Sequence, residues 1–196
     1  MVFDDAEIQW NENDFTNYDW KDFYMDAHES IPPNAPEPRG KPVQLNVFVD
    51  ANHARNRITR RSHTGILIYL NKAPIVWYSK AQTTVESSTF GSEFVGMRIA
   101  IDLIEGLRYK LRMLGVPLDG PANVLTDNLA VVQNATVPSS TLKKKHNAIC
   151  YHRVREAVAA NIIRIAHIPS KENLADMFTK PLPAFLLHLL AQRILY

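Results

Sequence analysis

The sequence has a single cysteine, Cys150, which excludes a disulfide within the chain. It has no basic and then apolar stretch near Met1, where acidic residues occur instead, so secretion is not expected. It also has no apolar run of the roughly 20 residues that a membrane-spanning helix needs. The longest apolar stretch, residues 184–196, is interrupted by polar side chains. We therefore expect an intracellular protein that does not enter a membrane.

The chain also lacks a complete set of zinc ligands. His146 and Cys150 would share one face of a helix, but His152 would not, and a fourth ligand is missing. We therefore expect packing and hydrogen-bonding roles for these three side chains.

Charge is distributed unevenly along an otherwise ordinary composition. The 196 residues are 46% apolar and 21% charged, which is typical of one soluble globular domain. Residues 1–30 hold nine acidic side chains and one lysine, leaving 21 basic and 11 acidic side chains, a net charge of +10, in the remainder. A basic body fits contact with a phosphate backbone, although it also fits simple solubility.

The first 40 residues differ from the rest of the chain. Residues 1–30 interleave acidic with aromatic side chains, and prolines crowd positions 32–38. We predict an acidic, aromatic segment with a proline-rich connection over residues 1–40, a domain over residues 41–183 and a helical tail over residues 184–196. The aromatic segment is expected to pack on the domain but to be dispensable for its folding.

Hydrophobic periodicity predicts the elements of the domain. Their order indicates an α/β fold with a five-stranded mixed sheet and helices on both faces. In chain order, the pattern predicts strands at residues 44–49, 65–70 and 73–78, a long helix at 88–114, a strand through 124–125, a short helix at 129–133, a second long helix capped by Thr141 and running from Leu142 to about Asn161, a strand at 162–168 and a closing helix.

Four carboxylates stand where these elements begin or end. Asp50 closes the first strand, Asp127 follows a later one, Glu93 lies in the first turns of the long helix, and Asp176 opens the closing helix. Each one also fits an ordinary role as a solvated strand end or a helix-terminal charge. In an open α/β sheet, however, such positions meet in one crevice. Four carboxylates there would repel one another unless divalent cations held them.

Several short motifs occur in a fixed order. They are Phe48-Val49-Asp50-Ala51, Arg60-Arg61-Ser62-His63-Thr64-Gly65, Val76-Trp77-Tyr78-Ser79-Lys80, Ser87-Ser88-Thr89 with Glu93-Phe94, Thr126-Asp127-Asn128, Lys145-His146 with Tyr151-His152, and Leu174-Ala175-Asp176 with Thr179-Lys180-Pro181-Leu182-Pro183. Each motif is weak alone. Together they resemble the ribonuclease H domain of copia-type retrotransposon polyproteins, over roughly residues 41–183.

The resemblance implies a ribonuclease H-like fold and an endonuclease that removes the RNA strand of an RNA/DNA hybrid during reverse transcription. It implies that Asp50, Glu93, Asp127 and Asp176 are catalytic metal ligands for two Mg²⁺ ions, for which Mn²⁺ can substitute. Glu93 precedes Asp127, an order that differs from that of integrase-like enzymes. A reverse transcriptase domain of the same polyprotein is the expected partner, although this chain has no paired-aspartate polymerase motif. The implied location is the cytoplasm or a virus-like particle.

Basic and polar side chains are candidates for contacts to the hybrid, which would be recognised by backbone shape and 2′-hydroxyls. Charge runs are equally common on solvated faces. His167 is a candidate proton shuttle that also fits a half-buried strand end. Trp77 and Tyr78 fit a core better than a base-stacking surface. The nucleic-acid candidates are Arg55, Arg57, Arg60, Arg61, Asn128, Lys143, Lys144 and Lys145.

Two positions depart from the family pattern, with Asn52 in place of an aspartate and Arg55 in place of a glycine. The main alternative is therefore a degenerate retrotransposon fragment that keeps the fold, with or without nucleic-acid binding, and has reduced or lost activity. A third hypothesis is a structural or protein-interaction module in which the acids are incidental. Because Asn52→Asp restores the family residue and adds negative potential near the cations, we expect it to preserve or raise activity.

Overall fold

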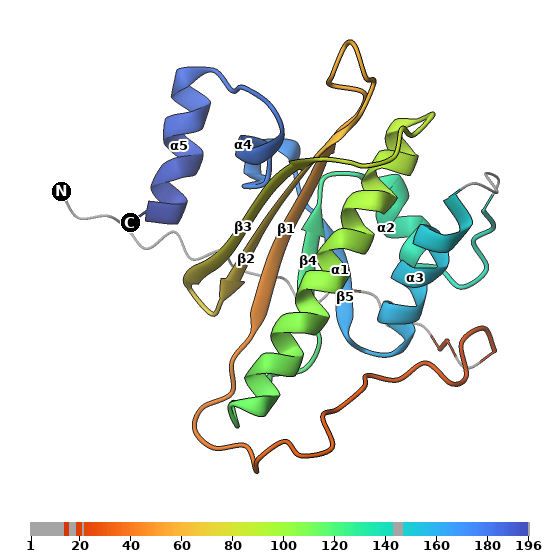
Figure 1. The fold of residues 1–196 in the computed structure, drawn as a ribbon, viewed down its shortest axis with the longest axis vertical. Coiled ribbons are helices and arrows are strands. Elements are labelled where there is room, and N and C mark those ends of the chain that lie inside the picture. The colour runs from red at the N-terminus through yellow and green to blue at the C-terminus, as the bar shows by residue number, and fades with distance from the viewer. Residues whose placement is uncertain (1–13, 16–18, 21, 143–146, 196) are drawn as a thin grey trace.

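The computed structural model describes residues 14–15, 19–20, 22–142 and 147–195. Within these residues, five strands form one sheet in the order β3-β2-β1-β4-β5 (Figure 1). β1 pairs with β2, and β2 with β3, in antiparallel fashion, whereas β1 with β4 and β4 with β5 are parallel. The predicted five-stranded mixed sheet is therefore confirmed. The elements are β1 (Leu45–Asn52), β2 (His63–Leu70), β3 (Ala73–Ala81), α1 (Thr89–Met113), β4 (Ala122–Thr126), α2 (Leu129–Thr136), α3 (Ala148–Ala159), β5 (Ile163–His167), the 3-10 turn Ser170–Glu172, α4 (Asp176–Thr179) and α5 (Ala184–Leu195).

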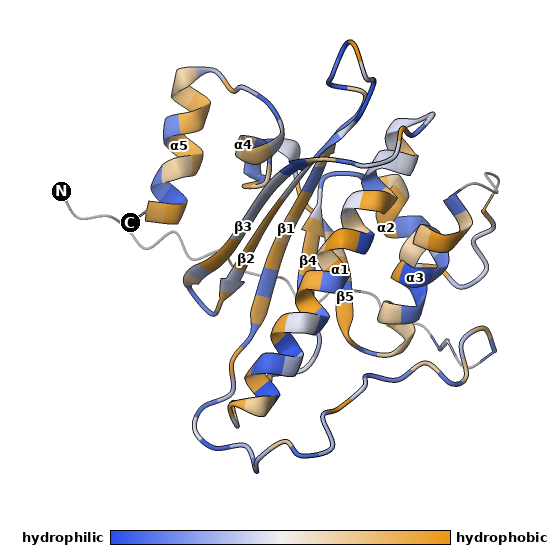
Figure 2. Ribbon diagram, viewed as in Figure 1, coloured by the Kyte–Doolittle hydropathy of each residue, from blue (hydrophilic) through white to orange (hydrophobic). Residues whose placement is uncertain are grey.

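The sheet has a hydrophobic core on each face. Side chains of a strand alternate between faces, so Val47 and Val49 of β1 point to one side and Phe48 to the other. The first side packs against α1 and α3, and the second against α5 and the segment around α4. Figure 1 shows the two groups of helices on opposite sides of the sheet, and Figure 2 shows the hydrophobic colour that the central strands share. Helices on both faces are therefore confirmed as well.

The long helix α1 begins and ends close to where its sequence pattern predicts. The hydroxyl of Ser88 caps it by accepting a hydrogen bond from the backbone N–H of Gly91 at 3.2 Å. Apolar residues at three- and four-residue steps, such as Phe94 and Ile101, are fully buried against the sheet. Gly115 follows the helix with a φ of +69°, a conformation that glycine adopts without strain. This helix holds its first turns against the end of the sheet.

The second long helix starts later than the sequence predicts. Thr141 and Leu142 are not helical, and α3 begins at Ala148 after Asn147. The physical reason is tertiary: the side chains of Tyr151 and Arg155 both donate hydrogen bonds to the backbone carbonyl of Ser140, at 2.7 and 2.9 Å. These contacts turn the segment before the helix back against α3, instead of letting it lead straight into the helix.

Two smaller expectations also differ from the structure. Asp50 does not close β1, because the strand continues to Asn52 and Asp50 pairs with Gly65 across the hairpin. Trp77 is 70% exposed, so its assignment to the core is wrong, whereas Tyr78 does pack against the core. β3 is an edge strand whose alternate residues face solvent, and periodicity alone does not reveal how much of that face the helices cover.

The C-terminal helix α5 lies on the face of the sheet opposite α1, where its Leu190 is buried. Much of its ribbon has the hydrophobic colour in Figure 2. Several of its hydrophobic side chains, including that of Phe185, are nevertheless exposed. Among the described residues, no helix combines the length and the apolar character that crossing a bilayer requires.

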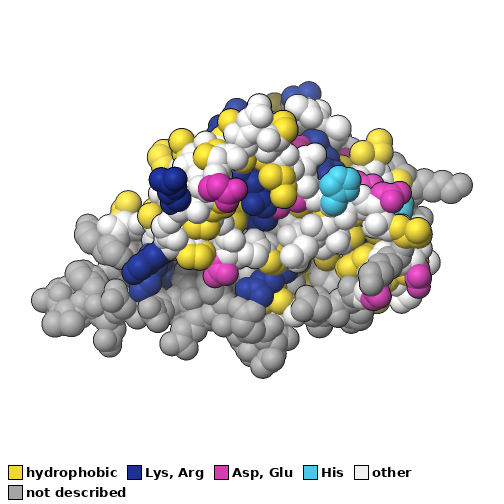
Figure 3. Space-filling model, turned by 90° about the horizontal axis from the view of Figure 1, so that it is seen from below, with side chains coloured by type: hydrophobic (Ala, Val, Ile, Leu, Met, Phe, Trp, Pro, Cys, Tyr) yellow, Lys and Arg dark blue, Asp and Glu magenta, His cyan; other side chains and the backbone are white. Residues whose placement is uncertain are grey.

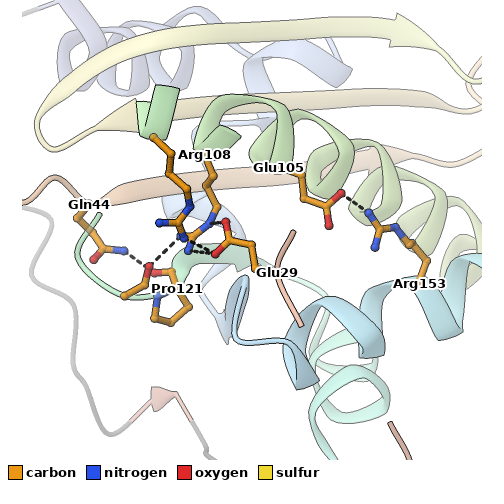
Figure 4. A network of polar contacts seen from close by, with 8 residues as sticks. Glu29, Gln44, Glu105, Arg108, Pro121 and Arg153 are labelled. Atoms are coloured by element: carbon orange, nitrogen blue, oxygen red, sulfur yellow. Dashed lines mark hydrogen bonds and ion pairs between the residues drawn. The ribbon is translucent and has the colours of Figure 1, made fainter. Parts of the chain in front are cut away.

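The segment before β1 makes polar contacts with α1 that reach into the protein. The carboxylate of Glu29 accepts hydrogen bonds from Arg108 at 2.7 and 2.8 Å, as Figure 4 shows. It also pairs with Arg112. Arg108 is only 4% exposed and donates a further hydrogen bond to the carbonyl of Gly120. Burial raises the pKa of Glu29, but the two guanidinium groups outweigh this effect and lower it overall. The same segment places Trp20 on the guanidinium of Arg155, 4.9 Å from the ring centre.

These contacts argue against the expectation that residues 1–40 are dispensable. Without Glu29, the buried guanidinium of Arg108 would lose its carboxylate partner. We therefore expect Glu29→Gln to lower the free energy of unfolding by about 3 kcal/mol, as breaking a buried ion pair does. Urea unfolding at neutral pH measures the change. Asp26→Asn is the matched control, since Asp26 is an exposed acid of the same segment. Equal, small losses in both variants would contradict this account.

Candidate active site

Asp50 and Asp127 come together because β1 and β4 are parallel neighbours. The register pairs Val47 with Val124 and Phe48 with Leu125, and the same offset places Asp127 beside Asp50. Asp176, the first residue of α4, joins them from the other side of the sheet end. One carboxylate oxygen from each of the three residues lies within 4.8 Å of the others. Three of the four carboxylates identified in the sequence thus form one cluster.

α4 reaches this cluster because it packs unusually close to β2. A Cβ on Gly65 would lie 2.6 Å from the carbonyl oxygen of Ala175 and 2.7 Å from the Cγ2 atom of Thr179. Gly65 pairs directly with Asp50 across the β1–β2 ladder. The absence of a side chain at this one position therefore lets the turn of α4 lie over Asp50.

Hydrogen bonds from buried side chains anchor the segment around α4. The amide of Asn173 donates to the carbonyl of Val49 at 3.1 Å and accepts from the N–H of Ala175 at 3.1 Å. From the edge strand, the hydroxyl of Ser79 donates to the carbonyl of Phe178 at 2.7 Å. A four-residue helix has little stability of its own, so these contacts hold it in place.

Glu93 is buried at the start of α1, beside the three aspartates. Its side chain is 4% exposed, and its Oε2 atom has no hydrogen-bond partner among the described residues. Burial raises the pKa of Glu93 well above its usual value, and the charges of Asp50 and Asp127 raise it further. A buried carboxylate oxygen without a partner is costly, which indicates that a cation or a proton belongs there.

Two residues of the cluster carry no role in the sequence-based assignment. Thr179 is completely buried and donates a hydrogen bond from its hydroxyl to Oδ2 of Asp50. The ammonium of Lys180 lies 2.9 Å from Oδ1 of Asp176. Thr179 and Lys180 follow Asp176 by three and four residues, the spacing that puts helical side chains on one face, and this was the signal available in the sequence.

The electrostatics of the site reflect crowded negative charge. Burial raises the pKa of Asp50 to about 6, against the hydrogen bond from Thr179 and together with the charge of Asp176. Burial lowers the pKa of Lys180, but its pairing with Asp176 outweighs burial and raises the pKa overall. Such perturbed groups in one place are typical of functional sites.

The donor atoms of the cluster fit a hard divalent metal ion. All of them are carboxylate oxygens, which magnesium, calcium and manganese prefer over nitrogen or sulfur ligands. Glu93, whose Oε2 atom lacks a partner, is outside this group of three but close enough for the charges of Asp50 and Asp127 to raise its pKa. Asp50, Asp127 and Asp176 could therefore hold a metal ion, with Glu93 as an additional carboxylate.

The remaining candidates lie at varying distances from this cluster. The amide oxygen of Asn128 caps α2 by accepting hydrogen bonds from the N–H groups of Ala130 and Val131, so part of this side chain has a structural role. His167 is exposed at the end of β5, where it pairs with Thr126, the residue before Asp127. The candidates Lys143, Lys144 and Lys145 lie outside the described residues.

The arginines between β1 and β2 belong to an exposed loop. Arg57, Arg60 and Arg61 face solvent, whereas Arg55 donates a hydrogen bond to the carbonyl of Thr179 at 2.5 Å. The loop projects at the top of Figure 1, beyond the end of β1 that carries Asp50. Figure 3 shows the opposite end of the molecule, where the coloured basic and acidic side chains are interspersed. The loop between β1 and β2 therefore carries four exposed arginines in a stretch of seven residues.

Sequence comparison identifies relatives among transposon proteins. The chain is 30% identical over 144 residues to the retrovirus-related Pol polyprotein from transposon RE1 of Arabidopsis thaliana, covering 74% of this chain and 10% of that protein. The chain is a relative of retrotransposon Pol polyproteins. The Pol polyprotein from transposon TNT 1-94 of Nicotiana tabacum is 29% identical over 139 residues, and the Gag-Pol polyprotein of transposon Ty1-JR2 of Saccharomyces cerevisiae is 28% identical over 153 residues. The match to the tobacco protein covers 71% of this chain and 10% of that protein, and the match to the yeast protein covers 74% and 8%.

The present chain thus spans about a tenth of the length of the curated proteins that it matches. No family model matches the chain. The resemblance to retrotransposon polyproteins that the motifs indicate is nevertheless confirmed by these relatives.

Solved structures identify the fold of this Pol relative as that of ribonuclease H. The N-terminal RNase H domain of Rv2228c from Mycobacterium tuberculosis superposes with a TM-score of 0.52 at 16% identity, over 76% of this chain and 97% of that one. LC11-RNase H1, in a crystal structure with an RNA/DNA hybrid, gives a TM-score of 0.54 at 16% identity, over 69% and 94%. At such low identity these structures establish the fold alone, and they confirm the predicted ribonuclease H-like fold.

The raised pKa of Asp50 predicts a pH dependence of stability. In the unfolded chain an aspartate titrates near 3.8, so ionising Asp50 destabilises the folded protein as pH rises from there through about 6. The contribution of protonated Asp50 to the free energy of unfolding is complete at low pH and is lost at neutral pH. In EDTA, Asp50→Asn should therefore gain stability relative to the parent between about pH 4.5 and about pH 7.5, by about 2 kcal/mol.

Urea unfolding of both proteins at the two pH values measures this difference. The neutral amide keeps an oxygen that can accept the hydrogen bond from Thr179, so the comparison isolates the charge. A stability difference that stays constant with pH would show that Asp50 ionises normally in the folded protein.

Proposed function

We propose that this chain is a Mg²⁺-dependent endoribonuclease that cuts the RNA strand of an RNA/DNA hybrid during reverse transcription. The observation that carries the proposal is the cluster of Asp50, Asp127 and Asp176, in which one carboxylate oxygen from each residue lies within 4.8 Å of the others. The partnerless oxygen of Glu93 beside the cluster supports it. The relatives named above are polyproteins of retrotransposons, and one fold neighbour was solved with an RNA/DNA hybrid.

In this proposal the carboxylates act through the position of metal ions. Asp50, Asp127 and Asp176, with Glu93, would hold two Mg²⁺ ions, and Mn²⁺ could replace them. When bound, Mg²⁺ would supply an activated water and stabilise the departing oxygen of the phosphodiester. The carboxylates therefore need correct placement and negative charge, and none of them has to form a bond to the substrate.

Other side chains would serve the substrate and its protons. Arg57, Arg60 and Arg61 are exposed in the loop beyond Asp50, which suits contacts to the phosphates of a hybrid. His167 remains our candidate for a proton shuttle, because it pairs with Thr126 next to Asp127. The reverse transcriptase region of the same polyprotein would be the partner that produces the hybrid, in the cytoplasm or in a virus-like particle.

The first test of this function is Asp127→Asn. We expect cleavage of a labelled RNA/DNA hybrid to fall by about a hundredfold or more, because a metal ligand loses its charge. Hybrid affinity, measured by fluorescence anisotropy, should remain close to that of the parent, since it depends on the basic loop. Omission of Mg²⁺ should abolish cleavage by the parent protein.

Asp119→Asn is the matched control, because Asp119 is an exposed aspartate at the opposite end of β4. It should cleave like the parent. If the parent binds the hybrid but does not cut it in Mg²⁺ or Mn²⁺, the chain is the degenerate, inactive fragment instead. Parental cleavage by Asp127→Asn would refute the assignment of the site.

The second test concerns the arginine loop. Replacing Arg57, Arg60 and Arg61 together by alanine should weaken hybrid binding and reduce the slope of log affinity against log salt by about two to three. The control replaces Arg39 and Lys41 by alanine. Both residues are exposed and precede the first residue of β1, at the end opposite the loop, so the slope of log affinity against log salt should stay near that of the parent. Both sets are measured by anisotropy in the non-cleaving Asp127→Asn background. Equal slopes in all proteins would place the hybrid elsewhere.

A further inference from the structure

Thr179 forms hydrogen bonds both to the carboxylate cluster and to residues at the end of β1 and the start of the β1–β2 loop. Its hydroxyl donates a hydrogen bond to Oδ2 of Asp50. Its backbone carbonyl accepts hydrogen bonds from Nη1 of Arg55 at 2.5 Å and from Nδ2 of Asn52 at 3.4 Å. Arg55 and Asn52 are the two positions at which this chain departs from the family pattern.

The bond from Thr179 fixes how Asp50 presents its carboxylate. One oxygen accepts from the hydroxyl, which stops the carboxylate from rotating freely about its terminal bond. The other oxygen keeps its full capacity to accept a metal ion. Metal ligands generally need such support, because a side chain that is free to rotate loses much of the affinity that a held ligand gives.

The position of Thr179 depends in turn on the C-terminal end of α4. The helix is four residues long, and Thr179 is its last residue. The guanidinium of Arg55 holds the carbonyl of this last residue, where a positive charge also suits the negative end of a helix. The sequence gives no sign of this contact, because Arg55 lies in a run of arginines. In the structure Arg55 is exposed and still makes the contact.

We propose that Thr179 is a positioning residue that holds Asp50 for metal binding, and that Arg55 holds Thr179. The inference rests on the proposed function. It assigns Arg55 to the support of the metal site and separates it from Arg57, Arg60 and Arg61, which have no such contact in the described residues. Asn52→Asp removes only the longer of the two contacts, because a carboxylate cannot donate a hydrogen bond to the carbonyl of Thr179. That this variant preserves activity remains a prediction.

The positioning role can be separated from general stability. The contacts of Asn173 with Val49 and of Ser79 with Phe178 anchor α4 independently of the Thr179 hydroxyl. Thr179→Val keeps the shape of the side chain and removes the hydroxyl, which also contacts the carbonyl of Asp176 at 3.2 Å. Thr179→Ser keeps the donor and should therefore rescue the site. Thr136→Val is the control, because Thr136 is another buried threonine, and its hydroxyl donates to the carbonyl of Val132 in α2, away from the carboxylates.

The experiment is a calorimetric titration of the complete chain with Mg²⁺ alone, without nucleic acid. We expect Thr179→Val to bind Mg²⁺ about tenfold more weakly than the parent, while Thr179→Ser and Thr136→Val bind within about twofold of it. On the hybrid, Thr179→Val should lower kcat at subsaturating Mg²⁺ and leave KM for the hybrid unchanged.

Arg55→Met provides a second test that does not disturb the core, since Arg55 is exposed. We expect Mg²⁺ binding that is weaker by about threefold or more, with an unchanged salt slope for hybrid binding. If Arg55 contacts phosphate instead, KM and the salt slope change while Mg²⁺ affinity does not, and the inference is overturned.

The outcomes for the inference and for the proposed function can be told apart. If the parent binds Mg²⁺ and Thr179→Val binds it equally well, Thr179 has no positioning role, and the proposed function stands. If the parent binds neither Mg²⁺ nor Mn²⁺, the proposed function fails and the inference fails with it. Should Thr179→Val not fold, the Mg²⁺ affinities of Thr179→Ser and Arg55→Met decide the question alone.

Discussion

The close approach of α4 to the sheet is the contact on which the rest of the site depends. It exists because Gly65 has no side chain, so that the carbonyl of Ala175 and the methyl group of Thr179 occupy the space where a Cβ would be. Asp176 reaches the two strand-borne aspartates from this position, and so does the hydroxyl that holds Asp50. Any other residue at position 65 has a Cβ, which would push α4 away from β2. The carboxylate of Asp176 would then be separated from the cluster.

The cluster itself is an energetic cost that the fold tolerates. Burial raises the pKa of both Asp50 and Glu93, and neighbouring carboxylates add to the effect, so full ionisation at neutral pH works against folding. Lys180 compensates part of the charge of Asp176. Unfavourable electrostatics concentrated in one place are typical of functional sites, and a cluster of carboxylates suits the binding of cations.

The sequence predicts well what depends on local pattern. Alternation predicts β1 and the hairpin, the three- and four-residue steps predict α1, and parallel neighbours follow from helices between strands. These features also place Asp50 level with Asp127. What could not be predicted depends on contacts between distant residues. Arg55 and Thr179 are 124 positions apart, and Glu29 and Arg108 are 79 apart. Hydropathy gives no signal of such pairs, and the late start of α3 has the same kind of cause.

The shortness of α4 has a consequence for when the site exists at all. A single helical turn costs more conformational entropy than its own hydrogen bonds return, so α4 forms only after both ends of the domain have met. The same turn can also open while the sheet stays folded, in a local fluctuation of lower free energy than global unfolding. Any ion that binds only the closed form would shift this equilibrium by mass action. Ion concentration would then regulate how much of the protein has an assembled site, in addition to how much of that site is filled.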